Sequence, residues 1–242
     1  MRKFFLVALA VFITGAAFAQ NDTTVNRNVL KPGMLPRPGD HLLLQFGYTS
    51  WQGAPDSIAT GGFPRSFNAY LMFDFLFKSN PRWSVAIGAG IATDNVYFDK
   101  GSVDITGRTT NLVFRNLSDT NSFKKYKLAT AYAEAPVELR FRSNPQDDRR
   151  SVKVAVGAKV GTLLNAHTKG KTLEDKAGNT VNDYKVKEFS KRYFNTTRIS
   201  LTSRIGYGHF SLFGSYQLTP LFKEGQAPTI RPLTIGLTLS GL

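Results

Sequence analysis

Charged residues alternate with apolar or small residues along several segments, and they are the groups in this sequence with the clearest chemical potential. Carboxylates and cations brought together in a confined interior can form a charged conduit or a ligand site. They can also form an ion-paired plug, because isolated buried charges are too costly to persist. We favour the plug. The candidate set is Asp74, Glu134, Glu138, Arg140, Lys153, Lys159, Arg198 and Arg204.

Histidine chemistry is the main catalytic alternative. His41 and His209 fall at the ends of predicted strands, and His167 falls in a long connection. A hydrolase that uses His167 with Glu174 or Asp183 is the version left open. The sequence has no cysteine, no phosphate-binding glycine motif and no metal-type histidine spacing. We therefore expect no cofactor, no metal site and no catalytic residues.

Eight segments with alternating apolar and polar residues would position these charges. They are His41–Ser50, Ser66–Phe77, Arg82–Thr93, Tyr126–Arg142, Ser151–Leu163, Asn195–Tyr207, His209–Leu218 and Ile230–Leu239. Their connections alternate between long and short. The long connections are Trp51–Arg65, Asp94–Lys125, Leu164–Phe194 and Thr219–Thr229, and the short ones are Lys78–Pro81, Ser143–Arg150 and Gly208. This asymmetry is typical of an all-β, antiparallel up-and-down transmembrane barrel with short periplasmic turns and long extracellular loops.

The alternation alone also fits a soluble exported barrel or sandwich with its apolar face turned inward. The polar faces, however, combine glycine with long charged side chains, which suits a narrow packed lumen. Aromatic residues also gather at both ends of the strands, as in interfacial girdles. One predicted belt comprises Phe77, Trp83, Tyr207 and Phe210, and the other comprises Tyr48, Trp51, Tyr126, Tyr193 and Phe194.

Ion pairing within the lumen can be predicted from the hairpin of the fourth and fifth strands. If Arg142 pairs with Ser151, Glu134 lies opposite Lys159. A slip of two residues instead places Glu138 opposite Lys153. Both registers give a carboxylate–ammonium pair.

The N-terminus has the features of an export signal. Arg2 and Lys3 precede the apolar run Phe4–Ile13, and Ala17-Phe18-Ala19 predicts cleavage before Gln20. We expect a signal peptide over 1–19, a flexible periplasmic segment over 20–40 and an outer-membrane β-barrel over 41–242. Removing the two basic residues lowers the formal net charge from +14 to +12. The remaining cations are scattered, which argues against a nucleic-acid partner.

Two of the long loops contain weak strand patterns of their own. Val103–Ile105 and Leu112–Phe114 flank Gly107, and Thr172–Tyr184 contains a turn signal at Ala177-Gly178-Asn179. Hairpins that project above the membrane are expected in both loops. We expect eight wall strands, and ten if these hairpins join the wall.

Four segments resemble the strands of PorT-like outer-membrane barrels, which are typical of Bacteroidetes. They are the run Tyr132-Ala-Glu134-Ala-Pro136-Val-Glu-Leu-Arg-Phe141, the run Val156-Gly-Ala-Lys-Val-Gly161, the segment Phe210–Leu218 and the segment Leu233–Leu239. The resemblance covers about the second half of the chain. It implies an eight-stranded outer-membrane barrel, with a link to a protein-secretion apparatus in some members.

The sequence therefore predicts a non-enzymatic outer-membrane protein with a closed lumen and a structural, interaction or secretion-accessory role. Its expected partners are outer-membrane lipid and lipopolysaccharide, and envelope or secretion-machinery proteins. A small-solute transport component is the alternative from a different class.

Overall fold

The structure is a computed structural model, and it describes residues 41–55, 58, 60–145, 147 and 150–241. The predicted signal peptide and the predicted segment 20–40 lie outside the described residues. Within the described part of the chain, no helix is long and apolar enough to cross a membrane.

The described chain is built from eleven strands. Their bounds are β1 Leu42–Gln52, β2 Thr60–Leu76, β3 Trp83–Phe98, β4 Gly101–Asp104, β5 Val113–Asn116, β6 Ser122–Arg142, β7 Val152–Glu174, β8 Thr180–Phe189, β9 Thr197–Tyr207, β10 Phe210–Gln217 and β11 Arg231–Ser240. All eight predicted wall strands are present, and the long loops add β4, β5 and β8.

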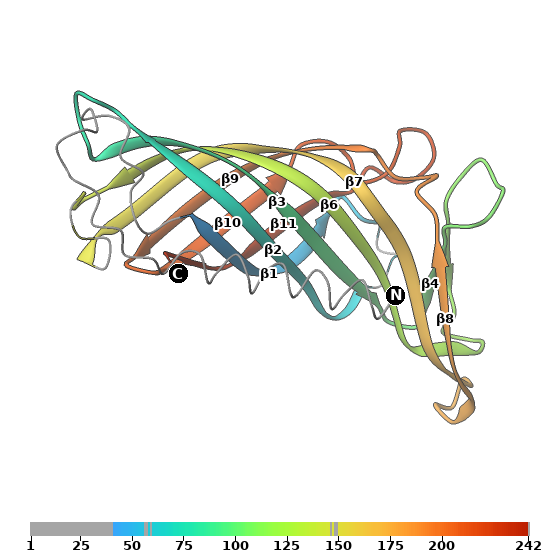
Figure 1. The fold of residues 1–242 in the computed structure, drawn as a ribbon. Helices are drawn as coiled ribbons and strands as arrows, with labels where there is room; N and C mark the ends of the chain where they lie inside the picture. The colour runs from blue at the N-terminus through green and yellow to red at the C-terminus, as the bar shows by residue number, and fades with distance from the viewer. Residues whose placement is uncertain (1–40, 56–57, 59, 146, 148–149, 242) are drawn as a thin grey trace, which may run out of the picture. The chain divides into compact units, whose positions relative to one another are not determined.

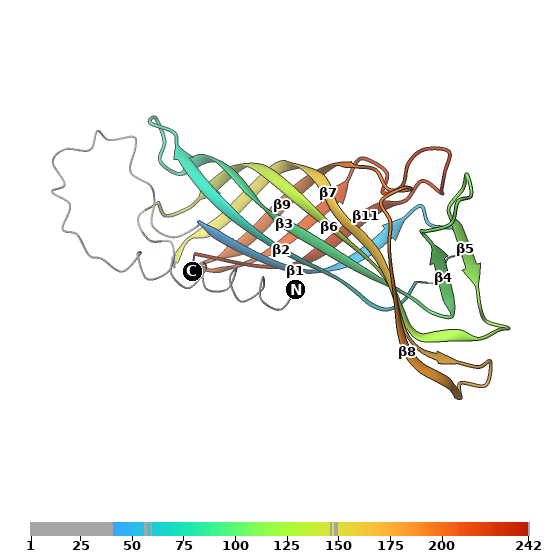
Figure 2. The same cartoon turned by 45° about the vertical axis from the view of Figure 1, so that its right-hand side comes forward.

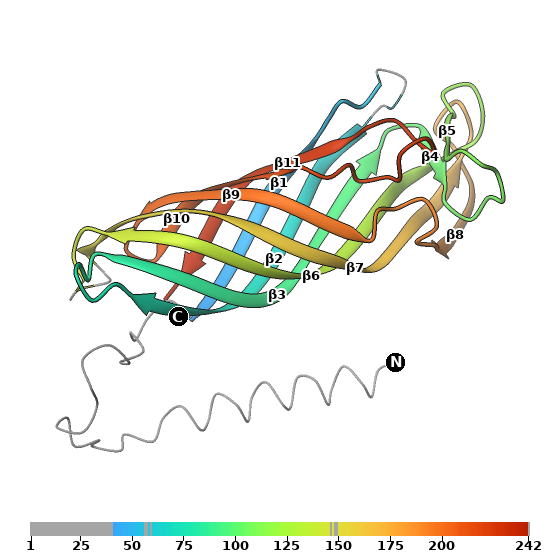
Figure 3. The same ribbon diagram turned by 90° about the horizontal axis from the view of Figure 1, so that it is seen from above.

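Eight of these strands close into a ring (Figures 1 and 3). Neighbours around the ring are β1, β2, β3, β6, β7, β9, β10 and β11, and β11 returns to β1. Every pairing is antiparallel, and the closing pair runs from Leu43 opposite Ser240 to Gln52 opposite Arg231. Closure leaves no free sheet edge around the wall.

Side chains alternate between the outside and the lumen along each wall strand. Phe73, Val156 and Leu237 are 60%, 51% and 57% exposed, whereas Lys159 and Arg204 are 4% and 6% exposed. Apolar residues therefore cover the outer surface, and charged residues are enclosed. A soluble barrel would require the opposite arrangement, so the alternation favours a wall that faces acyl chains.

The two ends of the barrel differ as the sequence predicts. The β2–β3, β6–β7 and β9–β10 connections are short, and at the last of them Gly208 adopts a φ of 59°. A two-residue turn with positive φ is favoured by glycine. The opposite end carries the β4–β5 hairpin and β8 (Figure 2).

The long strands extend further toward this loop end than predicted. β7 continues to Glu174, and its extension pairs with β8 instead of β9. A turn follows in which the Asn179 backbone N–H donates to the Asp175 carboxylate at 2.9 Å and Gly178 has a φ of 89°. The hairpin prediction is confirmed. β8 does not enter the ring, so the wall has eight strands and not ten.

Pro136 interrupts one of the two ladders that β6 forms. The β3–β6 pairing runs from Trp83 opposite Phe141 to Ile87 opposite Val137 and resumes at Gly90 opposite Glu134. On its other side Pro136 pairs with Lys159 of β7. Proline has no N–H to donate to a ladder. At Pro136 this missing donor falls on the β3 side, where the ladder is interrupted, as a proline within a strand requires.

The loop end of the barrel contains an apolar core that closes its mouth. Leu128, Tyr132 and Leu163 contribute from the inner wall, and loop residues complete the cluster. We call this cluster the cap: Ile58, Phe98, Val103, Ile105, Leu112, Tyr126, Leu128, Tyr132, Leu163, Ala166, Tyr193, Phe194, Leu221, Phe222 and Ile230.

Hydrogen bonds tie three loops together within the cap. The Tyr193 hydroxyl donates to the carbonyl oxygens of Gly107 and Thr109 at 2.6 and 2.8 Å. The Asn195 amide donates to the carbonyl oxygens of Pro220 and Phe222 at 2.7 and 2.9 Å. The loops are therefore folded over the mouth and anchored to one another.

The cap overturns most of one of the two predicted aromatic belts, in which Tyr48 alone of the five members is exposed, at 45%. Trp83, Phe77, Tyr207 and Phe210 are exposed beside the short turns, as expected. At the loop end, Tyr126, Tyr193 and Phe194 are 6%, 0% and 0% exposed, and Trp51 packs against the cap. These rings fill the mouth because the loops enclose a core, which a strand-end position in the sequence does not reveal.

Candidate functional site: the charged lumen

The charged residues of the lumen form two ion-paired groups below the cap. We call the group nearer the cap the upper network. Its centre is Arg198 of β9, whose Nη1 lies 2.7 Å from Asp94 of β3 and whose Nε lies 3.4 Å from Glu134 of β6. Lys159 Nζ lies 3.4 Å from the other Glu134 oxygen, and the Tyr70 hydroxyl donates to that oxygen at 2.6 Å. Two carboxylates are thus shared among two cations and a phenol.

Aromatic rings flank the cations of the upper network. The guanidinium of Arg198 lies 4.9 Å from the centroid of the Tyr132 ring, and Lys159 Nζ lies 5.5 Å from that of Tyr70. Cation–π contacts of this kind are strongest when the pair is removed from water. The rings therefore help to compensate the buried charge.

The lower network lies nearer the short turns and is centred on Glu138. Arg204 and Arg140 donate to the same Glu138 oxygen at 2.8 and 2.9 Å. Arg140 also contacts Asp74 at 2.6 Å, and Arg142 contacts the second Asp74 oxygen at 2.9 Å. The chain Arg204–Glu138–Arg140–Asp74–Arg142 therefore links β9, β6 and β2.

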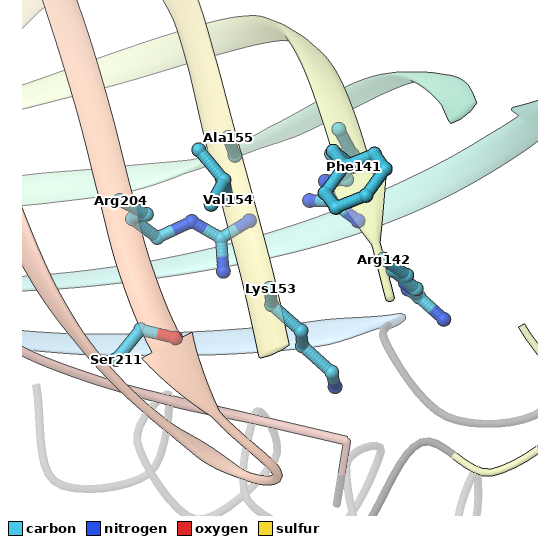
Figure 4. Close-up of a pocket in the computed structure, with 8 residues that line it drawn as sticks. Phe141, Arg142, Lys153, Val154, Ala155, Arg204 and Ser211 are labelled. Carbon is cyan, nitrogen blue, oxygen red and sulfur yellow. The ribbon is translucent and has the colours of Figure 1, made fainter. Parts of the chain in front are cut away.

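Little space remains around either network. A cavity of about 10 Å³ is lined by Arg140, Arg142, Lys153 and Arg204, together with Phe141, Val154, Ala155 and Ser211 (Figure 4). A second cavity of about 10 Å³ lies between Asp94 and the cap residue Leu221. Each holds at most about one water molecule.

The hairpin register differs from both predicted registers. Arg142 lies opposite Lys153, so Glu134 lies opposite Gly161 and Glu138 lies opposite Gly157. The predicted opposition of Glu134 with Lys159, and that of Glu138 with Lys153, are both wrong. Lys159 instead reaches Glu134 diagonally from its place opposite Pro136.

Facing glycines explain why this register is accommodated. A Cβ atom at Gly161 would lie 2.8 Å from Cγ of Glu134, and one at Gly157 would lie 2.1 Å from the Val137 carbonyl oxygen. At Gly161 the Glu134 side chain occupies the space that a side chain would fill, and at Gly157 the β6 backbone around Val137 and Glu138 occupies it. The turn sequence alone does not reveal this constraint.

The structure buries seven of the eight candidate residues within the ring, and the eighth, Asp74, is half-buried with a side chain that is 6% exposed. Asp74 is the partner of Arg140 and Arg142, and Lys153 lines the lower cavity. Sequence reasoning missed Asp94, Arg142 and Tyr70 as members. Asp94 was missed because the third strand was expected to end at Thr93, although it continues the inward row of Ala86 and Ala92.

The histidines do not assemble a catalytic group. The rings of His41 and His209 bond to the carbonyl oxygens of Met72 and Ser240 at 3.0 and 2.9 Å, beside the short turns. His167 lies on the extension of β7, seven residues from Glu174, or about 23 Å along a strand. Glu174 bonds to Lys124 at 2.9 Å, and Asp183 accepts a bond from Thr172 at 2.7 Å.

These contacts separate the three groups of the hydrolase alternative and assign other partners to two of them. Among the described residues, no group of three histidine or acidic side chains is arranged to hold a metal ion. In the described part of the chain, the lumen networks contain ion pairs and the Tyr70–Glu134 hydrogen bond, and none of the three histidines is a member.

Comparison with known proteins gives the family. Residues 42–224 match the family model described as outer membrane protein beta-barrel domain. The chain belongs to this family. It is an outer-membrane protein, and its eight-stranded ring is the barrel of that family.

Two solved structures of Ail, the attachment invasion locus protein of Yersinia pestis, are similar. One, in complex with the heparin analogue sucrose octasulfate, has 14% identity and a TM-score of 0.34, with 83% of this chain and 94% of that chain covered. The other has 14% identity and a TM-score of 0.32, with 85% and 98% covered. A search of curated proteins finds no match.

Proposed function

We propose that this protein is a non-enzymatic outer-membrane barrel with a closed lumen, in which the charged residues are structural and the loop end is the interacting surface. The observation that carries this proposal is that the interior of the barrel is closed at two levels. An apolar cap fills the mouth, and two ion-paired networks fill the lumen beneath it.

The role of the eight candidate residues follows from this arrangement. Ion pairs that cross the lumen link strands distant in sequence, as Arg198 links to Asp94 and Arg204 to Glu138. Buried charges held in ion pairs rigidify a structure and leave few groups available to a solute. We therefore assign a structural role to Asp74, Glu134, Glu138, Arg140, Lys153, Lys159, Arg198 and Arg204.

Ion conductance separates the closed barrel from the small-solute transport alternative. The full-length protein, reconstituted in planar bilayers, is expected to give no stable single-channel current, because the described lumen cavities hold about one water each. A porin reconstituted in parallel controls for insertion. Large reproducible channels would contradict the closed lumen and favour transport.

Placement among PorT-like barrels of Bacteroidetes type is part of the proposal. The strand from Tyr132 to Phe141, with Glu134 inward and Pro136 at a broken ladder position, supports it. A secretion-accessory role and contact with envelope proteins follow from that placement. Export by residues 1–19 and a periplasmic segment over 20–40 complete it.

In-cell crosslinking followed by mass spectrometry tests the interaction role. Reproducible crosslinks from the loop end to a component of a secretion apparatus would support the accessory role. Crosslinks only to lipopolysaccharide and abundant envelope proteins would leave the structural role and remove the accessory one.

A further inference from the structure

An ordered array of lysines covers the outer face of the barrel where β6, β7 and β8 extend beyond the membrane-facing wall. In one row Lys127, Lys169 and Lys187 lie directly opposite one another on the three strands. In the next row Lys125, Lys171 and Lys185 do the same. We call these six residues the lysine array. Figure 2 shows β8 beside the end of β7.

The array faces outward. The inner positions of the same strands, such as Tyr126, Leu128 and Thr168, are buried. The six lysines are less enclosed: Lys127 and Lys169 are half-buried, and Lys125, Lys171, Lys185 and Lys187 are exposed. Successive residues of a strand point to opposite faces, so the lysines share the outer face. They are therefore accessible from the surroundings of the barrel.

This arrangement is unfavourable for the protein alone. Like charges directly opposite each other on neighbouring strands destabilise a sheet. Among the residues that the structure describes, no carboxylate lies within salt-bridge distance of these six lysines; Lys127 bonds instead to the neutral amide oxygen of Asn95 at 2.6 Å. Asp183, which also belongs to β8, accepts a hydrogen bond from the Thr172 hydroxyl.

Lys127 senses the positive charge of its neighbours. Burial, followed by Lys169, Arg65 and Lys187, lowers the pKa of Lys127. The contributions of these three cations, which come after that of burial, show that they lie close to Lys127.

Protection of a free sheet edge does not account for the array. Lysines on an edge strand discourage pairing with other chains, and this explains Lys185 and Lys187 on β8. Lys127 and Lys169, however, lie on β6 and β7, which are paired with each other and with neighbours on both sides at this level. Protection of a sheet edge therefore does not explain the charges of Lys127 and Lys169.

The position of the lysine array relative to the membrane-facing wall indicates which kind of molecule it binds. Phe67 and Phe189 are 41% and 55% exposed on the outer face, and Arg65 and Lys187 follow two residues further toward the loop end. Two residues span about 7 Å along a strand. The polar layer of one leaflet is about 5–8 Å thick, so the first lysine row lies at headgroup depth.

We propose that the lysine array binds the phosphate groups of a phosphorylated glycolipid of the outer leaflet. The inference rests on the proposed function in that it requires the outer wall to face lipid, but it does not require a closed lumen. Adjacent strands are about 4.8 Å apart, so each row presents three ammonium groups across about 10 Å. That spacing suits a phosphate bridged by two or three lysines.

Lipid binding to the full-length barrel in phosphatidylcholine nanodiscs tests the proposal. The probes are lipid A with two phosphates, dephosphorylated lipid A and soluble inorganic pyrophosphate. The Lys127→Gln/Lys169→Gln/Lys187→Gln variant is expected to bind phosphorylated lipid A on the order of 100-fold more weakly, at about fivefold per cation. Rising salt should also weaken binding to the original protein.

A control variant removes the same charge elsewhere. Lys78→Gln/Lys191→Gln/Lys223→Gln changes three exposed lysines outside the array and should bind lipid A like the unsubstituted chain. Equal binding of phosphorylated and dephosphorylated lipid A, or unchanged binding by the array variant, would overturn the proposal. So would binding of pyrophosphate without any binding of membrane-embedded lipid A. A conducting barrel that still binds lipid A here would remove the closed lumen and leave this inference intact.

Discussion

Replacing Glu138 with glutamine is expected to destabilise the folded barrel by about 3–5 kcal/mol, the cost of breaking a buried ion pair. Both Arg140 and Arg204 donate to one oxygen of this carboxylate. The side chains of Arg140, Arg204 and Glu138 are 3%, 5% and 5% exposed. The amide keeps the shape of the side chain but removes its charge. Urea unfolding of the refolded protein in detergent micelles measures the change.

Asp119→Asn is the matched control for the Glu138 variant. Asp119 pairs with Lys176 at 3.0 Å, but the two side chains are 85% and 68% exposed. Exposed ion pairs contribute little because water and salt screen them. If Glu138→Gln were as stable as the original chain and as Asp119→Asn, the lower network would not hold the barrel together.

Replacing Phe222 with alanine is expected to cost about 3–5 kcal/mol and to loosen the cap. Phe222 is 1% exposed, and its ring centroid lies 5.1 Å from that of Phe194 and 6.1 Å from that of Trp51. Truncation removes a ring shared by three segments of the cap. Hydrogen exchange should rise at the backbone around Tyr193 while the wall strands stay protected.

Phe63→Ala provides the comparison for the Phe222 variant. Phe63 also belongs to the loop end, but it is 61% exposed and contacts the ring of Tyr48 at 5.4 Å. Its truncation should leave exchange in the cap unchanged. Equal exchange around Tyr193 in the two variants would contradict a packed cap, because only one of them removes a buried ring.

Local alternation in the sequence predicted the wall because each strand obeys it independently. The run from Val152 to Gly161 assigns each residue to one face without knowledge of the neighbouring strands. The connection lengths then fix the topology, because an antiparallel ring with alternating short and long links has one simple closure. The positions of the eight lumen residues follow from the same rule.

Features that depend on contacts between distant segments were not predictable in this way. The β6–β7 register at Glu134 and Glu138 depends on the space at Gly157 and Gly161, and it shifts again at the irregularity between Ala131 and Tyr132. The cap combines rings from four parts of the chain, so the burial of Tyr193 and Phe194 has no local signature. The lysine array becomes visible only once β8 is paired with β7.

The account depends on which side of the wall meets the acyl chains. In lipid nanodiscs, NMR cross-relaxation between acyl-chain protons and selectively labelled methyl groups tests this without any substitution. Signals are expected from Val156 and Leu237, which face outward, and none from Met72 and Ala155, which are 1% and 5% exposed. Acyl-chain signals at Met72 and Ala155, with none at Val156 and Leu237, would show that the barrel is inverted relative to the arrangement described.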